Sequence, residues 1–133
     1  MRNQKGSVMV ETVFACMILL LIFAGMTEIV FLVRDEIGVI RVAREGAREA
    51  ALSGNLSAGT ARAYEVAAMT LLSRPRVEMT TEAAGGATDV ICRASYAHYP
   101  FFSRLKLPLI GDVTWGVVNL SEEARYHFRD YAE

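Results

Sequence analysis

The chain has 133 residues, of which 53% are apolar, and its formal net charge at pH 7 is −1. A nearly neutral chain lacks the strong basic field that nucleic-acid binding requires, so we expect no nucleic-acid partner. Once a membrane-length apolar run near the N-terminus is set aside, about a hundred residues remain, enough for one small domain.

The first predicted element is an apolar helix near the N-terminus. Apolar residues dominate from Val8 to Val33, and no charged residue lies between Thr12 and Thr27. As a helix this run would be about 39 Å long, which exceeds the roughly 30 Å of a bilayer's hydrocarbon core. We therefore expect residues 7–33 to cross a membrane as one helix and residues 34–133 to form an extracytoplasmic domain.

The carboxylate of Glu11 lies at the start of this run, and the short leader before it carries Arg2 and Lys5. A carboxylate among apolar neighbours costs a few kcal/mol unless it is paired or neutralised. One interpretation is that Glu11 lies at the level of the lipid headgroups and reaches water. The other starts from cleavage after Gly6, which would create a free amine on Ser7 and make Glu11 the fifth residue of the new chain.

The order of basic leader, glycine, glutamate five residues later and apolar helix resembles the class III signal of type IV pilin-like proteins. The resemblance implies that a prepilin peptidase removes residues 1–6, so that Gly6 and Ser7 form the processing site. It also implies that Glu11 meets the terminal amine of a neighbouring subunit, since opposite charges in a low-dielectric bundle offset each other's desolvation only when they meet. An ordinary secretory signal fits less well, because its apolar region would be about 7–15 residues long and Ala24–Gly25 is a poor cleavage site.

The helix should continue beyond the span to about Leu52, because no helix-breaking sequence occurs before Ser53. Small and apolar residues fall on one side of this continuation and should pack on the domain; they are Val39, Ile40, Ala43, Ala47, Ala50 and Ala51. Arginines fall on the other side: Arg34, Arg41, Arg44 and Arg48. This arginine stripe is either a solvated helix face or a contact with another subunit or with lipid headgroups. The basic leader before the span places the N-terminus in the cytoplasm.

Residues 42–51 read VAREGAREAA and contain an A-R-x-G-A-R-x-A-A pattern. Directly after a membrane-length helix, this pattern resembles the TadE-like family of the Tad, or Flp, pilus apparatus, and the likeness covers roughly residues 1–54. It implies a non-enzymatic minor pilin or pseudopilin in the bacterial inner membrane, with a periplasmic domain, that initiates, primes or caps pilus assembly. Flp-type pilins usually carry tyrosine where this chain has Thr12, which argues against the abundant pilin itself.

The partners implied by the resemblance are the prepilin peptidase, other minor pilins, the major pilin, the inner-membrane assembly platform and membrane lipid. No small-molecule substrate, cofactor or metal is expected, because His98 and His127 lack ligand-like spacing and no catalytic motif is present. The alternative function is an unprocessed single-pass membrane protein whose domain binds an envelope ligand or regulator.

The remaining elements predict an α+β, pilin-like fold. A second helix is expected from Ser57 to about Ser73, with an apolar face of Ala61, Tyr64, Ala68, Leu71 and Leu72. Two strands at about 77–82 and 90–96 should pair as an antiparallel hairpin with a longish loop that turns at Gly85–Gly86. The second strand should present Val90, Cys92, Ala94 and Tyr96 on one face. A third strand at 112–117 and a last helix from Asn119, with Glu122 in a capping box, complete the prediction.

Aromatic residues concentrate around Pro100, between the second and third predicted strands. One interpretation is a loop whose rings cover the core. The other is a docking patch made of Tyr99, Phe101 and Phe102 for another subunit or for an envelope ligand.

Overall fold

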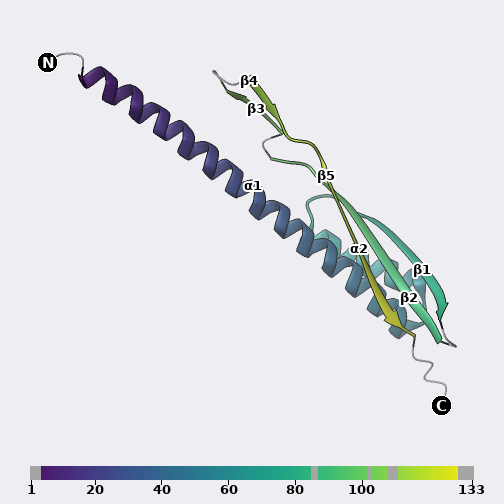
Figure 1. Ribbon diagram of the computed structural model, residues 1–133. Coiled ribbons are helices and arrows are strands. Elements are labelled where there is room, and N and C mark those ends of the chain that lie inside the picture. Colours follow the sequence, from purple (N-terminus) through teal and green to yellow (C-terminus); the bar gives the residue numbers. More distant parts are fainter. Residues whose placement is uncertain (1–3, 85–86, 102, 108–110, 129–133) are drawn as a thin grey trace.

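The computed structural model describes residues 4–84, 87–101, 103–107 and 111–128. Its longest element is α1, Gln4–Ser53, a single helix of 50 residues. At 1.5 Å of rise per residue it is about 75 Å long. Helix α2 and the three-stranded sheet pack against its second half, while the first half extends away from them (Figure 1). The predicted continuation of the apolar helix to about Leu52 is confirmed.

The first half of α1 is apolar and does not pack into a core. It is the one helix in the described part of the chain that is long and apolar enough to cross a membrane, and none of its most apolar 18-residue window is buried. A core helix of a soluble domain would bury these side chains, because each exposed leucine or phenylalanine forfeits about 1.5–3 kcal/mol of burial free energy. The N-terminal half of α1 therefore has the properties of the expected membrane span.

Helix α1 ends where the backbone requires a glycine. Gly54 has φ of 65°, in the left-handed region that lets glycine end a helix without steric cost. Asn55 then caps α2, Leu56–Thr70, because its side-chain Oδ1 accepts a hydrogen bond from the Ser57 amide at 2.9 Å. The second helix therefore starts one residue before the predicted Ser57 and ends three before the predicted Ser73.

Helix α2 packs on α1 through its smallest residues, Gly59, Ala63 and Ala67, which are buried. The two backbones are so close that a Cβ on Gly59 would lie 2.5 Å from the Cβ of Ala50 and 2.6 Å from the carbonyl oxygen of Gly46. The predicted apolar face of α2 is therefore wrong in part. Leu71 is buried and Tyr64 half-buried, as expected, but three members of that face are exposed: Ala61, Ala68 and Leu72. Close backbone approach favours the small-residue stripe over the larger side chains.

The main sheet has three antiparallel strands in the order β1-β2-β5. Strand β1, Arg76–Ala84, pairs with β2, Ala87–His98, and β2 pairs with β5, Val118–His127. The predicted hairpin is confirmed, and so is the inner face of β2, whose residues Val90, Cys92, Ala94 and Tyr96 are buried. Pairing extends to Ala84 opposite Ala87, so the connection is short and the predicted longish loop is wrong. The predicted turn residues Gly85–Gly86 lie outside the described residues.

The helix predicted from Asn119 is wrong, because these residues form strand β5. Half-buried Leu120, Glu122 and Ala124 alternate with exposed residues, which is the period of two expected of a strand. Glu122, predicted for a capping box, lies opposite Ala94 in the sheet, and Glu123 lies opposite Arg93 with an ion pair of 2.7 Å. Pairing with β2 outweighs the helix propensity of the Glu-Glu-Ala-Arg sequence.

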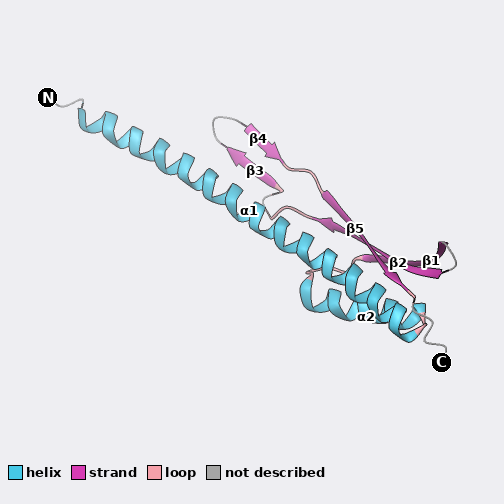
Figure 2. Ribbon diagram, turned by 60° about the horizontal axis from the view of Figure 1, so that its bottom comes forward, coloured by secondary structure: helices cyan, strands magenta, loops and turns pink. Residues whose placement is uncertain are grey.

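The predicted third strand at 112–117 is also placed differently. Strand β4, Gly111–Thr114, pairs with β3, Arg104–Leu107, in a separate two-stranded sheet. The Trp115 amide then donates a hydrogen bond to the Ser103 carbonyl at 3.3 Å. In both views this hairpin projects beyond the main sheet, alongside the N-terminal half of α1 (Figures 1 and 2).

The core lies where both helices cover one face of the sheet. It is a small cluster with members from three elements, completed by half-buried Val77, Met79, Leu120 and Ala124 of the strands. Its buried members are Val39, Val42, Ala43, Ala63, Ala67, Leu71, Ala94 and Tyr96. The predicted small-residue side of α1 is thus the side that contacts the domain. The α+β fold class is confirmed.

Candidate functional site

The most distinctive cluster of polar groups lies at the end of β2, where His98 is only 5% exposed. Its Nδ1 lies 2.7 Å from Asp35 Oδ2 and its Nε2 lies 3.0 Å from Glu28 Oε1. The second carboxylate oxygen of Glu28 accepts a hydrogen bond from the Phe101 amide at 3.0 Å. We refer to His98, Glu28 and Asp35 as the His98 cluster. It joins the sheet to the middle of α1.

The helical period of α1 and the two-residue alternation of β2 bring these residues together. Glu28 and Asp35 are seven residues apart, which is two helical turns, so both lie on one side of α1. That side continues into the core as Val39 and Val42. His98 extends the inner face of β2 by the two-residue alternation of a strand. The helix stripe and the strand face that form the core therefore meet in a buried polar cluster at their membrane-proximal end.

The two carboxylates favour the charged form of the His98 ring. Burial by itself would lower the pKa of His98, but hydrogen bonds to Asp35 and Glu28, together with their negative charges, outweigh it and raise the pKa above its ordinary value. An imidazolium donates from both ring nitrogens, which matches an acceptor on each side. In the part of the chain that the structure describes, no buried side-chain nitrogen or oxygen lacks a hydrogen-bond partner.

The geometry indicates a fastening contact. The carboxylates bind opposite nitrogens of one ring, so the three groups do not converge on a common point as metal ligands do. Across the described residues, no group of three or more His, Cys, Asp or Glu side chains is arranged to hold a metal ion. A buried charged cluster of this kind fixes one arrangement, because shifting the helix by one turn would separate the buried charges. It sets the position of the domain along α1.

Apolar and aromatic side chains surround the His98 cluster. The ring of Phe101 stacks on Phe31 of α1 with a centroid distance of 6.4 Å. A hollow of about 370 Å³ lies beside this stack and also contacts Tyr96, Tyr99 and His98. A second hollow, of about 420 Å³, also contacts His98 and is lined mainly by Ile29, Leu32, Pro100, Trp115 and Val118. The cluster thus lies between two open hollows of mainly apolar lining.

The residues predicted as sites lie far apart along α1. Gly6 and Ser7 are in its first turns, and Glu11 is exposed on the apolar half. The three arginines of the predicted contact, Arg41, Arg44 and Arg48, are exposed on the second half. Thirty residues of helix separate Glu11 from Arg41, or about 45 Å. Of the predicted docking patch, Tyr99 and Phe101 are exposed beside the His98 cluster, and Phe102 lies outside the described residues.

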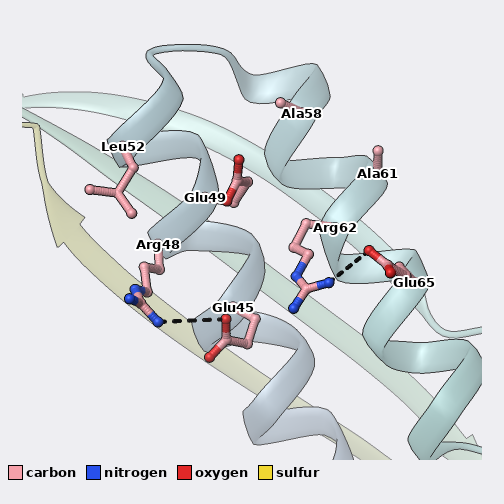
Figure 3. A pocket seen from close by; sticks show the side chains of 8 residues that line it. All are labelled: Glu45, Arg48, Glu49, Leu52, Ala58, Ala61, Arg62 and Glu65. Carbon is pink, nitrogen blue, oxygen red and sulfur yellow. Dashed lines mark hydrogen bonds and ion pairs between the residues drawn. The ribbon is translucent and has the colours of Figure 1, made fainter.

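A charged groove runs between α1 and α2 at the other end of the domain (Figure 3). It is open, has a volume of about 580 Å³, and is lined by Glu45, Arg48, Glu49, Leu52, Ala58, Ala61, Arg62 and Glu65. Arg62 pairs with Glu65 at 2.7 Å and Arg48 with Glu45 at 4.0 Å, each within its own helix. Exposed pairs of this type contribute little to stability, and the groove carries both signs of charge.

Sequence reasoning missed Glu28 and Asp35 as members of a site. Asp35 carries no site motif of its own, and His98 is prominent in the sequence only as a histidine without ligand-like spacing. Two signals were nevertheless present. A carboxylate inside an apolar run needs a partner, and Glu28 and Asp35 are spaced by two turns on the stripe that continues as Val39 and Val42.

These features define a class of protein: a small α+β domain fastened to the second half of a long N-terminal helix whose first half is exposed and apolar. A family model described as TadE-like protein matches residues 6–48, which is most of α1. The match confirms the predicted resemblance over this segment and fits a membrane protein associated with the Tad pilus system. No curated protein and no solved structure matches the chain.

Proposed function

We propose that this chain is a membrane-anchored minor pilin or pseudopilin that takes part in initiating, priming or capping assembly of a Tad (Flp) pilus. The observation that carries the proposal is the continuity of α1 from Gln4 to Ser53. Its exposed apolar half suits lipid or a bundle of like helices, its second half holds the domain, and the TadE-like segment covers the junction. One unbroken helix transmits a push or pull on the domain directly to the membrane segment.

Processing after Gly6 by a prepilin peptidase would remove residues 1–6 and leave Ser7 as the N-terminus. Glu11 then lies one helical turn from the new amine, exposed on an otherwise apolar surface. Such a carboxylate needs a partner in a low-dielectric environment. We assign Glu11 to an assembly contact with the terminal amine of a neighbouring subunit.

The proposed location is the bacterial inner membrane, with the N-terminus in the cytoplasm and the domain in the periplasm. The proposed partners are other minor pilins, the major pilin and the inner-membrane assembly platform. Arg41 is thirteen residues beyond Glu28, about 20 Å farther along the helix. This distance exceeds the thickness of a headgroup layer. A contact through Arg41, Arg44 and Arg48 would therefore be made with another subunit and not with lipid.

Intact-mass measurement of the protein purified from its native membranes tests the processing step. The expected mass is that of a chain beginning at Ser7. A Gly6→Leu variant, which places a bulky side chain at the cleavage site, should retain residues 1–6. Retention of residues 1–6 by the native chain would make it a permanent anchor, and cleavage near Ala24 would contradict the membrane span itself.

Complementation of pilus assembly tests the role of Glu11. Glu11→Ala and Glu11→Val should abolish or strongly reduce piliation while leaving the protein in the membrane. Glu36→Ala is the matched control, since Glu36 is an exposed glutamate on the same helix just beyond the proposed span. Normal piliation in both Glu11 variants would refute the assembly contact.

A further inference from the structure

Exposed aromatic side chains gather around α1 at one level, next to the His98 cluster. Tyr99 and Phe101, from the connection after β2, are 69% and 76% exposed, and Trp115, from the segment after β4, is 41% exposed. Phe101 stacks on Phe31, and Trp115 shares a hollow with Ile29 and Leu32 of α1. Segments separated in sequence thus place aromatic rings around a single turn of the helix.

The length of the apolar run places this turn relative to a bilayer. Twenty residues from Val8 to Thr27 span about 30 Å, the thickness of a hydrocarbon core. The next turn, from Glu28 to Leu32, covers about 6 Å more, which corresponds to one headgroup layer. The aromatic rings therefore lie at the depth where tryptophan and tyrosine are enriched in membrane proteins, because their rings are partly apolar and partly polar.

We propose that Tyr99, Phe101 and Trp115 form an aromatic anchor that holds this end of the domain at the headgroup layer of the same bilayer that α1 crosses, with the β3–β4 hairpin reaching from that level alongside the span (Figures 1 and 2). The proposal rests on the proposed membrane helix of residues 7–33, with residues 8–27 in the hydrocarbon core and its last turns among the headgroups, and extends it to the domain. Lipid is the occupant because the anchor residues adjoin the apolar helix: Phe101 stacks on Phe31, and Trp115 shares a hollow with the exposed Ile29. Val118, which lines the same hollow as Trp115, is also exposed.

The His98 cluster makes this depth compatible with its buried charges. Each ring nitrogen of His98 faces a carboxylate, and Glu28 has a second hydrogen bond from the Phe101 amide. Charged groups near lipid are tolerated when they are paired and shielded in this way. The cluster also fastens β2 to α1, so the anchor and the span keep a fixed distance from each other. The depth of the domain is therefore built into the fold.

Trp115 is the only tryptophan in the chain, so its fluorescence reports the depth of the anchor directly. The full chain is reconstituted at low protein density into phosphatidylcholine vesicles. The lipids carry bromine either near the glycerol end or near the methyl end of the acyl chains, and iodide serves as the aqueous quencher. The anchor predicts a blue-shifted emission, stronger quenching by the bromines near the glycerol end, and little quenching by iodide.

Two variants in a Trp115→Phe background calibrate the measurement. Phe23→Trp, at an exposed position in the proposed span, should be quenched by the bromines near the methyl end. Leu52→Trp, at an exposed position near the far end of α1, should be quenched by iodide alone. Both replaced side chains are exposed, so neither change disturbs the core.

The outcomes separate the anchor from the span. If Trp115 is quenched by iodide and not by brominated lipid while Phe23→Trp responds to lipid, the span stands and the anchor is refuted. If Trp115 is shielded from both kinds of quencher, another protein surface covers it, and the anchor is again refuted. If neither tryptophan responds to brominated lipid, the membrane span fails together with the anchor.

Discussion

His98 Nδ1 lies 2.7 Å from Asp35 Oδ2, although 63 positions separate the two residues in the chain. Together with the Glu28 contact on the other ring nitrogen, this hydrogen bond fastens the end of the central strand to the middle of the long helix. The contact is buried, so its charges depend on one another and not on water. The stability of the whole arrangement should therefore be sensitive to His98.

Replacing His98 by alanine should lower the free energy of unfolding by about 3–5 kcal/mol, because it leaves two buried carboxylates without their shared partner. The measurement is a guanidinium titration of the full chain in detergent micelles, followed by circular dichroism. The matched control is His127→Ala, which removes an exposed histidine whose Nδ1 lies 2.6 Å from Asp89 Oδ1. Since exposed pairs contribute little, the control should cost less than about 1 kcal/mol. Equal costs for the two variants would contradict a special role for the His98 cluster.

Stability should fall as the pH rises above the ordinary histidine range. The carboxylates of Asp35 and Glu28 raise the folded-state pKa of His98 against the opposing effect of burial. The stabilisation is therefore fully present below the unfolded-state pKa of about 6.5 and is lost as the pH rises through the higher folded-state value. Unfolding midpoints measured between about pH 5.5 and 9 should show this decline. The decline should disappear in His98→Gln and persist in His127→Gln; its survival in His98→Gln would assign it to another group.

Gly59→Ala should destabilise the packing of α2 on α1. The added Cβ would lie 2.5 Å from the Ala50 Cβ and 2.6 Å from the Gly46 carbonyl oxygen, so the helices must move apart. Overpacking of this kind costs about 1–3 kcal/mol, even though alanine has the better helix propensity. Gly116→Ala is the control, because nothing lies within 4 Å of its added Cβ. A Gly59→Ala variant that is as stable as the unmodified chain would show that the helices are not in close contact.

The arginine stripe should affect assembly without affecting the fold. Arg41 and Arg44 are exposed on the second half of α1, so a double alanine variant should change the free energy of unfolding by no more than about 0.5 kcal/mol. If the stripe contacts another subunit, the same variant should reduce piliation. Arg76→Ala, which removes an exposed arginine from β1, should leave piliation normal. Normal piliation in the double variant would leave the stripe as a solvated helix face.

Local patterns were sufficient for the elements whose signal lies within a short stretch of chain. The unbroken apolar and then amphipathic run predicted α1 almost to its last residue, and alternation predicted β1 and the inner face of β2. The TadE-like resemblance likewise depends on contiguous residues and is matched over 6–48. These signals survive folding because hydrophobic length and side-chain period are properties of consecutive residues.

Long-range pairing accounts for the errors. The Glu-Glu-Ala-Arg sequence within residues 118–127 favours a helix. These residues instead form a strand because they pair with the edge of β2, where Glu123 lies opposite Arg93. The face of α2 was misassigned because α1 offers Gly46 and Ala50, which admit a close small-residue contact. The edge of β2 and the small-residue side of α1 determine these two structures, and neither can be read from the local sequence of residues 118–127 or of α2.

The His98 cluster depends both on local helical spacing, which the sequence shows, and on long-range packing, which only the tertiary structure shows. The sequence contains Glu28 in an apolar run and Asp35 two helical turns later, but this local spacing did not by itself predict a site. The partner of both carboxylates is a histidine more than sixty positions away, and the packing of β2 across α1 places it there. A buried carboxylate needs a neutralising partner, and the tertiary structure determines which residue of the chain is that partner.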